Sequence, residues 1–546
     1  MPTRPRAQSV EAWQNRRFGL FIHLGLYSIP AGHWSGKEIT GYSEQIRAHA
    51  GIPKGEYAEL ANQFNPIKWD PDAVAKLAKA AGMKFVVLTA KHHDGFSLFH
   101  TQQSKFNVVD GTPYRQDIVK GLAEACRREG LEFGVYFSTI DWNFEGATGI
   151  DYGPDGGARN DNFIPEAHEE FNVAQLKELM TGYGPISEVW FDMGHPTEAQ
   201  SRRFADTVHD HQSESMVSGR VFNYQGDFTV MGDNEIPPYP LEVPWQAPAS
   251  IFHETWGYRE WQRRDNLAAK TAEHLRNFIK VISRGGNYLL NIGPRGDGSI
   301  VEYEADLLHA MGNWIAAHAE AIEGANPQPF RHLEFGAATW KPGRLFLFVW
   351  NWPADGIALL PGLKNNLLSA KQLGSGEVLQ VEANQVHIGS FAPPPPLEIG
   401  KVSPPPLPVV IEVTFEGDLE VLLPSIAADS VGNFNLSAAE ADKFYQYNGA
   451  GYDDPPILYR LRWHIQVQEP GSYELQIVSP ETNQLDSLDL LIGSKQQRLP
   501  IATLQLPVSE SLPVEVRLAN PDLHERMLES ITACGLIPRK LGRSSE

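Results

Sequence analysis

The chain has 546 residues, a length that suggests three or four units of about 150 residues, or fewer if one of them is a barrel. Hydrophobic residues make up 42% and charged residues 21%, which is the balance of a globular protein rather than of a disordered one. The net charge of −21 (46 basic minus 67 acidic residues) repels nucleic acid phosphates and anionic membranes. We therefore expect neither a nucleic acid nor a membrane as a partner.

The cysteines and the first residues restrict the chain further. Only Cys126 and Cys534 occur, far apart, which excludes a disulfide framework and a cysteine zinc site. Residues 1–10 are polar and lack the apolar region of a signal peptide, and no apolar run approaches 18 residues. As given, the sequence predicts a cytoplasmic protein, or a secreted or periplasmic one if a signal peptide has been removed.

Over the first 320 residues, short apolar strands alternate with amphipathic helices. Six or more such repeats predict a parallel sheet wrapped by helices. Because no Gly-rich phosphate loop follows the first strand, we expect a (β/α)8-like barrel rather than an open sheet. The expected strands are residues 18–23, 85–90, 133–138, 188–192, 217–222, 251–255 and 288–292, and the expected helices are 73–81, 118–129, 174–180, 198–209, 267–283 and 304–319.

The pattern changes after residue 324. Short strand-like runs between Gly, Pro and Asn turns follow, and two proline clusters at 393–396 and 404–408 are typical of stiff connectors. Alternating apolar and polar residues return after them, for example at 459–467. We expect a catalytic barrel over 1–325, a β-sandwich over 326–408 and an additional β-sandwich over 409–546.

Polar side chains gather where the expected barrel strands end, which is where barrels place their active sites. Hydrolysis of a glycosidic bond needs two carboxyl groups, while His and Arg side chains bind hydroxyl groups and aromatic rings pack on the sugar. The combination therefore favours sugar chemistry. The strand-end residues are His23, His92, His93, Tyr136, Asp192, Arg220 and Trp256.

Two other functions fit part of this set. A metal-dependent hydrolase could use His23, His92, His93 and Asp192 as ligands. Against it, adjacent histidines on a strand point to opposite faces, and the helical two-histidine spacing of zinc proteases is absent. A catalytically degenerate sugar-binding barrel is the second alternative, and it depends on whether two carboxylates face each other.

Several stretches in these strands resemble the α-L-fucosidases of glycoside hydrolase family 29. They are RFGLFIHLG at 17–25, TAKHHDGF at 89–96, VWFD at 189–192, TWGY at 255–258 and GGNYLLNIGP at 285–294, which together span about 280 residues. The resemblance implies an exo-acting enzyme that removes terminal α-L-fucose with retention, through a fucosyl-enzyme intermediate. It implies fucosylated oligosaccharides or glycoconjugates as substrates and no metal or cofactor.

The resemblance also implies a role for each matching residue. Asp192 matches the nucleophile, and Arg220 matches an arginine near it. Trp256 matches the aromatic residue that packs on the C6 methyl group of fucose. The implied hydroxyl ligands and pocket residues are His23, His92, His93, Trp34 and Tyr136.

Three positions depart from the family pattern. Met193 follows the nucleophile where the family usually has Gly, and Gln45 stands where a pocket Trp is common. Gln246 replaces a frequent Glu, which removes one candidate carboxylate.

The acid/base residue of the family lies on a variable loop, often as a Glu before a hydrophobic residue and a proline. An ungapped alignment on Ile236 and Pro237 puts Asp233 in this position, with Glu235 two residues later. The alignment favours Asp233 and leaves Glu235 as the alternative. Asp227 and Glu242 are the next candidates.

Aromatic residues of the last domain allow two interpretations. Trp463, Tyr445, Tyr447 and Tyr452 could form the platform of a carbohydrate-binding module. We expect instead that they are core or loop residues of a structural spacer.

Overall fold

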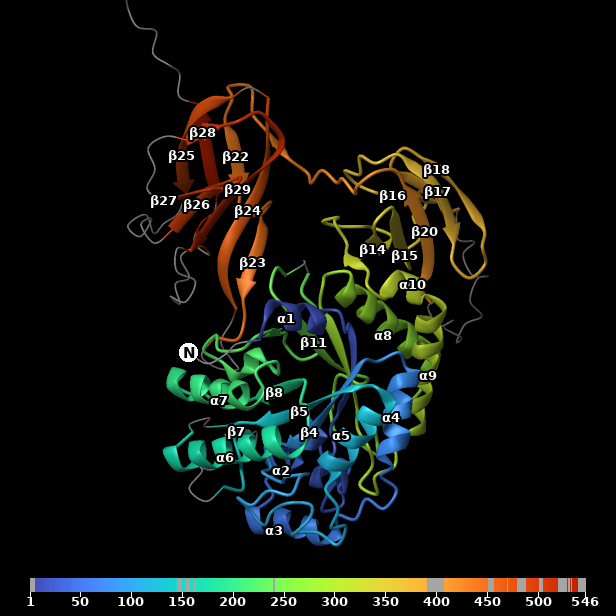
Figure 1. The fold of residues 1–546 in the computed structure, drawn as a ribbon, viewed down its shortest axis with the longest axis vertical. Coiled ribbons are helices and arrows are strands. Elements are labelled where there is room, and N and C mark those ends of the chain that lie inside the picture. Colours follow the sequence, from blue (N-terminus) through green and yellow to red (C-terminus); the bar gives the residue numbers. More distant parts are fainter. Residues whose placement is uncertain are drawn as a thin grey trace, which may run out of the picture.

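The computed structural model combines a barrel with two regions of antiparallel sheet (Figure 1). It describes residues 5–144, 150–152, 158–160, 164–238, 241–389, 407–449, 456–468, 470–478, 488–499, 504–518, 528, 531 and 533–538.

Eight parallel strands form the sheet of the N-terminal region, in the order β10-β11-β12-β1-β4-β5-β8-β9. An isolated parallel bridge between Ser218 and Phe228 joins the two outer strands and closes the ring. The expected (β/α)8-like barrel followed by β-sandwiches is confirmed. The strands are β1 (Phe18–Ile22), β4 (Phe85–Lys91), β5 (Glu132–Ser138), β8 (Glu188–Asp192), β9 (Met216–Val217), β10 (Thr229–Val230), β11 (Trp245–Ser250) and β12 (Asn287–Ile292).

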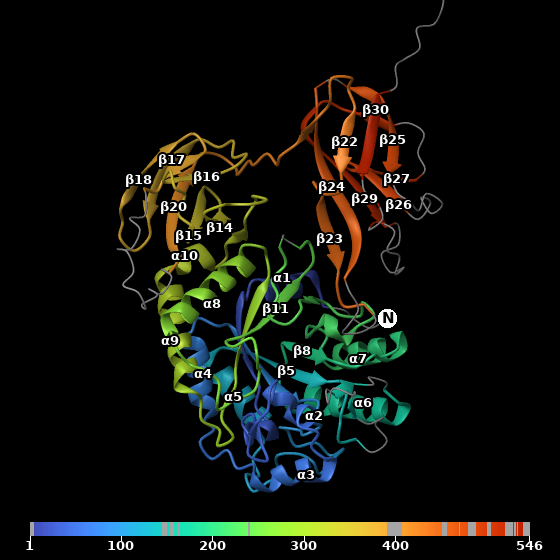
Figure 2. The ribbon, with the colours of Figure 1, turned by 180° about the vertical axis from the view of Figure 1, so that it is seen from behind.

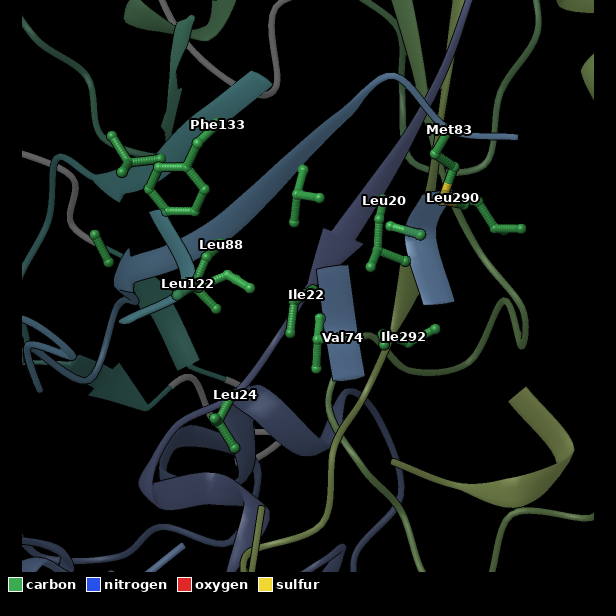
Figure 3. Close-up of a cluster of buried hydrophobic side chains, with 14 of the residues drawn as sticks. Leu20, Ile22, Leu24, Val74, Met83, Leu88, Leu122, Phe133, Leu290 and Ile292 are labelled. Carbon is green, nitrogen blue, oxygen red and sulfur yellow. The ribbon is translucent and has the colours of Figure 1, made fainter. Parts of the chain in front are cut away.

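Side chains alternate across this wall because successive residues of a strand face opposite sides. On β1, Leu20 and Ile22 face the helices, whereas Phe21 lies in the barrel interior with Tyr136 and Trp190. Figure 3 shows the outer layer, in which Leu20 and Ile22 lie near Val74 of α4. Most side chains of the wall are therefore apolar, and polar groups such as Glu188 and Asp192 lie near the ends of the strands.

Helices cover the outside of the barrel, and most of them match the expected positions. Asp70 and Asp117 cap the first turns of α4 and α5, and Thr197 forms a capping box at α7. The helices are α1 (Ala7–Gln14), α2 (Ile46–His49), α3 (Lys54–Ala58), α4 (Pro71–Ala80), α5 (Ile118–Glu129), α6 (Glu166–Gly182), α7 (Glu198–His211), α8 (Leu267–Ile282), α9 (Glu302–Ala317) and α10 (Ala319–Ile322), with 3-10 turns η1 (Leu26–Ser28), η2 (Ser43–Gln45), η3 (Glu59–Gln63) and η4 (Gly219–Val221). Two small hairpins, β2 (His33–Trp34) with β3 (Lys37–Glu38) and β6 (Ile150–Tyr152) with β7 (Ala158–Asn160), lie in its loops.

Two strand predictions were wrong in their bounds. The strand expected at 217–222 ends after Val217, because the chain turns into η4 and then takes positive φ angles at 222–224. The strand expected at 251–255 is β11, six residues earlier, where Pro248 hides the strand pattern.

The middle region is one antiparallel sheet that folds over onto itself. Its hydrophobic core contains Ala358 and Val386 from strands at one end of the sheet, together with Leu347 from a strand near the other end. The strands are β13 (Asn326–Pro327), β14 (Gly336–Lys341), β15 (Arg344–Val349), β16 (Ile357–Leu359), β17 (Leu367–Gln372), β18 (Val378–Glu382), β19 (Gln385–His387) and β20 (Val409–Phe415).

In the last region a six-stranded sheet packs against a four-stranded sheet. One hydrophobic core lies between them and contains Phe434 of the smaller sheet and Leu461 of the larger. The larger sheet contains β21 (Ile426–Ala427), β23 (Asp442–Gln446), β24 (Ile457–Val467), β26 (Leu488–Ile492), β27 (Lys495–Arg498) and β29 (Ser509–Leu518), and the smaller one β22 (Phe434–Ser437), β25 (Gly471–Val478), β28 (Leu504–Leu506) and β30 (Ala533–Pro538).

One expectation for this half of the chain needs correction, and the expectation that its aromatic residues are core residues is supported for Trp463. Strand β20 was expected to begin the last domain, but it pairs with β15 and β17 of the middle sheet. The division into three domains stays a prediction, and we propose that its second boundary lies after Phe415. Trp463 does not belong to an exposed sugar platform, because it is 2% exposed and its indole N–H donates to the Ser437 carbonyl. Tyr452 lies outside the described residues.

None of the helices in the described ranges has the length and apolar character needed to cross a membrane.

Candidate active site

Strand β8 carries a carboxylate to the C-terminal end of the barrel interior. Glu188, Trp190 and Asp192 alternate along it, so all three face inward. Glu188 accepts a hydrogen bond from the Trp13 indole at 2.7 Å, and the Trp190 indole donates to Gln246 at 2.8 Å. Asp192 is the last of the three and the first to reach the open end.

Two donors hold the Asp192 carboxylate. The Tyr136 hydroxyl donates to Oδ2 at 2.7 Å, and Arg220 Nη1 donates to Oδ1 at 3.0 Å. The side chain is 11% exposed. Burial raises the pKa of Asp192, while the Arg220 charge acts in the opposite direction and favours the ionised form. The result is a fixed, ionisable carboxylate at the end of a strand.

The residue after Asp192 is Met193, where the family pattern usually has glycine. Met193 has a φ of 61°, a left-handed conformation that glycine adopts without cost. Its side chain packs against the cluster of Ile140 and Trp142. The turn therefore forms with Met at this position, and the Met193 side chain takes part in packing.

Arg220 joins Asp192 to a second carboxylate. It lies in η4, and its Nη2 donates to Asp233 Oδ1 at 2.7 Å and to the Met231 carbonyl at 2.9 Å. The guanidinium also lies over the Trp190 ring, 5.0 Å from its centroid. Two carboxyl groups thus share one guanidinium at the end of the barrel.

A tight turn decides which carboxylate of the loop faces inward. The Glu235 amide donates to the Gly232 carbonyl at 3.0 Å, and Asn234 accepts from the Ser250 amide of β11 at 2.7 Å. Asp233, whose side chain is 19% exposed, consequently faces Arg220, whereas Glu235 is exposed and folds back over Gly232. The geometry favours Asp233 over Glu235 as the partner of Asp192.

Three neutral histidines line the same end. Asn291 donates its amide N–H to the Trp256 carbonyl, so its oxygen accepts from His23 Nδ1 at 2.7 Å. Ser138 donates to the Ile140 carbonyl and therefore accepts from His93 Nδ1 at 2.8 Å. Both rings keep an unprotonated Nε2.

Burial keeps these rings uncharged. It lowers the pKa of His23 to about 4 and that of His93 to about 3, and it also lowers the pKa of His92. Nε2 of His93 lies 3.9 Å from Asp192 Oδ2. Neutral Nε2 atoms next to this carboxylate can accept hydrogen bonds from hydroxyl groups.

Trp256 is held by residues that the sequence did not single out as site residues. Glu44 Oε2 accepts from the Trp256 and Gly257 amides at 3.0 and 2.8 Å. Burial raises the pKa of Glu44 to about 7. The Trp256 ring lies 5.4 Å from that of His23 and is 7% exposed. Asn291 lies in the family-like stretch 285–294 and Glu44 stands next to Gln45, one of the positions that depart from the family pattern, which was the available signal for them.

The remaining candidates lie elsewhere. Trp34 is half-buried on the β2–β3 hairpin and packs against the barrel core. Asp227 accepts from the Val217 amide at 2.7 Å and pairs with His209, while Glu242 pairs with Arg460 and Arg462 of the last region. The recorded contacts of Asp227 and Glu242 are structural ones, which removes both from the list of acid/base candidates.

One argument against a metal centre was wrong. His92 and His93 follow β4 rather than lie within it, so alternation no longer applies, and their ring centroids are 3.9 Å apart. Nonetheless, no three His, Cys, Asp or Glu side chains within the described ranges are arranged to hold a metal ion. His23 and His93 both use Nδ1 in hydrogen bonds to neighbouring side chains.

Known proteins are similar to this chain in sequence and in fold. The family model described as alpha-L-fucosidase matches residues 3–320. The rat tissue alpha-L-fucosidase is 29% identical over 370 residues, which cover 64% of this chain and 78% of the relative. The crystal structure of an alpha-L-fucosidase from Vibrio sp. strain EJY3 superposes with a TM-score of 0.68 at 25% identity, covering 98% of this chain and 99% of that one.

A second structure bears on the chemistry. It is a GH29 alpha-L-fucosidase from Bacteroides thetaiotaomicron, trapped as a covalent intermediate in complex with 2-fluoro-fucosyl fluoride. Its TM-score is 0.65 at 25% identity, with 76% of this chain and 98% of that chain covered. Because the family model covers more than half of the chain, the protein belongs to the alpha-L-fucosidase family.

Proposed function

We propose that the protein is a retaining, exo-acting α-L-fucosidase that hydrolyses terminal α-L-fucose from fucosylated oligosaccharides or glycoconjugates. The observation that supports this most is the single guanidinium of Arg220, which contacts both Asp192 and Asp233 where the barrel strands end. A double displacement at the anomeric carbon requires two carboxyl groups close to each other, and a single side chain contacts both of them here.

In this mechanism Asp192 attacks the anomeric carbon while a protonated Asp233 donates its proton to the leaving oxygen. Attack converts Asp192 into a neutral ester, which leaves the positive charge of Arg220 to Asp233 alone. Asp233 is then stabilised as a carboxylate and takes a proton from the water that cleaves the ester. The shared arginine thus fits the change of role from acid to base.

The other side chains bind and orient the sugar. The neutral Nε2 atoms of His23 and His93 accept hydrogen bonds from hydroxyl groups, and Trp256 packs its ring on the C6 methyl group. Tyr136 keeps the Asp192 carboxylate in one orientation through its hydrogen bond to Oδ2. Each of these functions works without charge on the histidines.

The test compares Asp233→Asn with Glu235→Gln on two substrates, an activated aryl α-L-fucoside and a fucosylated oligosaccharide. Only the oligosaccharide has a leaving group that needs protonation, so Asp233→Asn should slow its hydrolysis by about 10²- to 10⁴-fold and the aryl fucoside much less. Glu235→Gln should affect both substrates mildly and alike. The same leaving-group pattern in the Glu235 variant would exchange the two roles, and a wild-type protein inactive on every fucoside would refute the function.

A further inference from the structure

The barrel lacks helical cover beside β10. In the described part of the chain no α-helix lies between β9 and β10, or between β10 and β11. In both views of the fold, β23 of the last region extends down to the barrel (Figures 1 and 2). Tyr447, just after β23, packs against the barrel core, and Tyr224 of the barrel packs against the core of the last sandwich.

Asn448 completes the wall of the barrel at this position. Its side-chain oxygen accepts from the Val230 amide at 3.0 Å, and its side-chain N–H donates to the Val230 carbonyl at 3.1 Å. These two bonds imitate a neighbouring strand on the side of β10 that faces β9, where the Ser218–Phe228 bridge lies just before β10. Val230 is buried, so without Asn448 its backbone groups would lose their partner.

The same residue abuts the turn that carries Arg220. A Cβ atom on Gly219 would lie 2.1 Å from Asn448 Oδ1 and 2.9 Å from the Phe228 carbonyl oxygen, so a larger residue would have to displace Asn448. The neighbouring Gly449 carbonyl accepts from the Asn223 amide at 2.7 Å. That bond holds a segment in which Phe222, Asn223 and Tyr224 have positive φ angles, a conformation that costs about 1–3 kcal/mol per residue unless its surroundings enforce it.

Residues 448 and 449 therefore hold η4 and β10, the two elements that meet at the Asp233 carboxylate. On one side is η4 with Arg220, and on the other is β10, which leads directly to the Met231 carbonyl and to Asp233, both partners of Arg220. We propose that Asn448 is a positioning residue for catalysis, through which the last region sets the distance between Arg220 and Asp233. The proposal rests on the proposed function.

The test uses Asn448→Gly in the full chain. Asn448 has a φ of 68°, so glycine removes the amide without adding backbone strain. We expect kcat on the fucosylated oligosaccharide to fall at least tenfold and kcat on the aryl fucoside to fall less, with KM little changed. The reason is that the substitution displaces Asp233, the acid that only the oligosaccharide needs. In the Asp233→Asn background the same change should produce little further loss, since residues that act through one group are not additive.

The matched control is Glu242→Gln, which weakens the ion pairs to Arg460 and Arg462 in the same interface without touching β10 or η4. It should leave both activities at the wild-type level. If Asn448→Gly fails to fold, Asn448→Asp, which keeps the acceptor for the Val230 amide and loses the donor, should show a smaller loss with the same leaving-group dependence.

If the wild-type protein is an active fucosidase, three outcomes would overturn the proposal for Asn448 and leave the proposed function intact. They are wild-type kinetics in the Asn448 variants, equal losses on both substrates, and full additivity with Asp233→Asn. An inactive wild type would instead overturn the proposed function itself.

Discussion

Glu44→Gln tests the physical account of the site without relying on catalysis. Glu44 is fully buried, and its Oε2 accepts the backbone N–H groups of Trp256 and Gly257. A glutamine oxygen accepts the same two bonds, so the substitution removes the ionisable group and leaves the contacts in place.

The size and direction of the effect follow from the pKa. Burial raises the pKa of Glu44 from 4.5 to about 7. Between these values the folded protein keeps a proton that the unfolded chain has released, so stability from this group is present at low pH and is lost as the pH rises through about 7. From pH 5 to pH 7 the loss is about 2 kcal/mol, because the slope of 1.36 kcal/mol per unit decreases near each of the two pKa values.

The assay is differential scanning calorimetry of both proteins between pH 5 and pH 8. The variant should gain several degrees in Tm relative to wild type as the pH rises, and comparing the two cancels the other titrating groups. Glu56→Gln, which removes an exposed charge from α3, is the control. A Tm difference between the Glu44 variant and wild type that stays constant across this range would refute the reasoning.

Two further predictions concern the nucleophile and metal dependence. Tyr136→Phe removes a hydrogen bond to the Asp192 carboxylate that is worth about 1.5–3 kcal/mol, so kcat/KM should fall by about tenfold to a hundredfold while the Tm changes little; unchanged kinetics would contradict this role. Dialysis against a strong chelator should leave fucosidase activity unchanged, because the proposed mechanism uses the carboxyl groups of Asp192 and Asp233 alone. Loss of activity that zinc restores would favour a metal-dependent hydrolase.

Much of the site could be predicted from the sequence because alternation along a parallel strand is a local property. Phe21 and His23, or Trp190 and Asp192, face the same side because they are two residues apart. The rule ended with the strand: His92 and His93 lie beyond β4, and the expectation that they point apart was wrong.

What the sequence could not predict depends on contacts between distant segments. Strand β10 has two residues. The backbone of the second, Val230, forms hydrogen bonds with the side-chain amide of Asn448, 218 residues away. Strand β20 follows a proline cluster that is typical of a linker, yet its partners are β15 and β17. Trp463 is buried by the facing sheet, which no local pattern around it reveals.

The central claim is that Asp192 forms a covalent ester with fucose. The most direct measurement is incubation with 2-fluoro-fucosyl fluoride, which slows breakdown of the ester, followed by mass spectrometry of the intact protein and of its peptides. The account predicts one sugar per chain, attached to the peptide that contains Asp192, and no labelling of Asp192→Ala. A label on another residue, or turnover of the reagent with no adduct even in the Asp233→Asn variant, would contradict it.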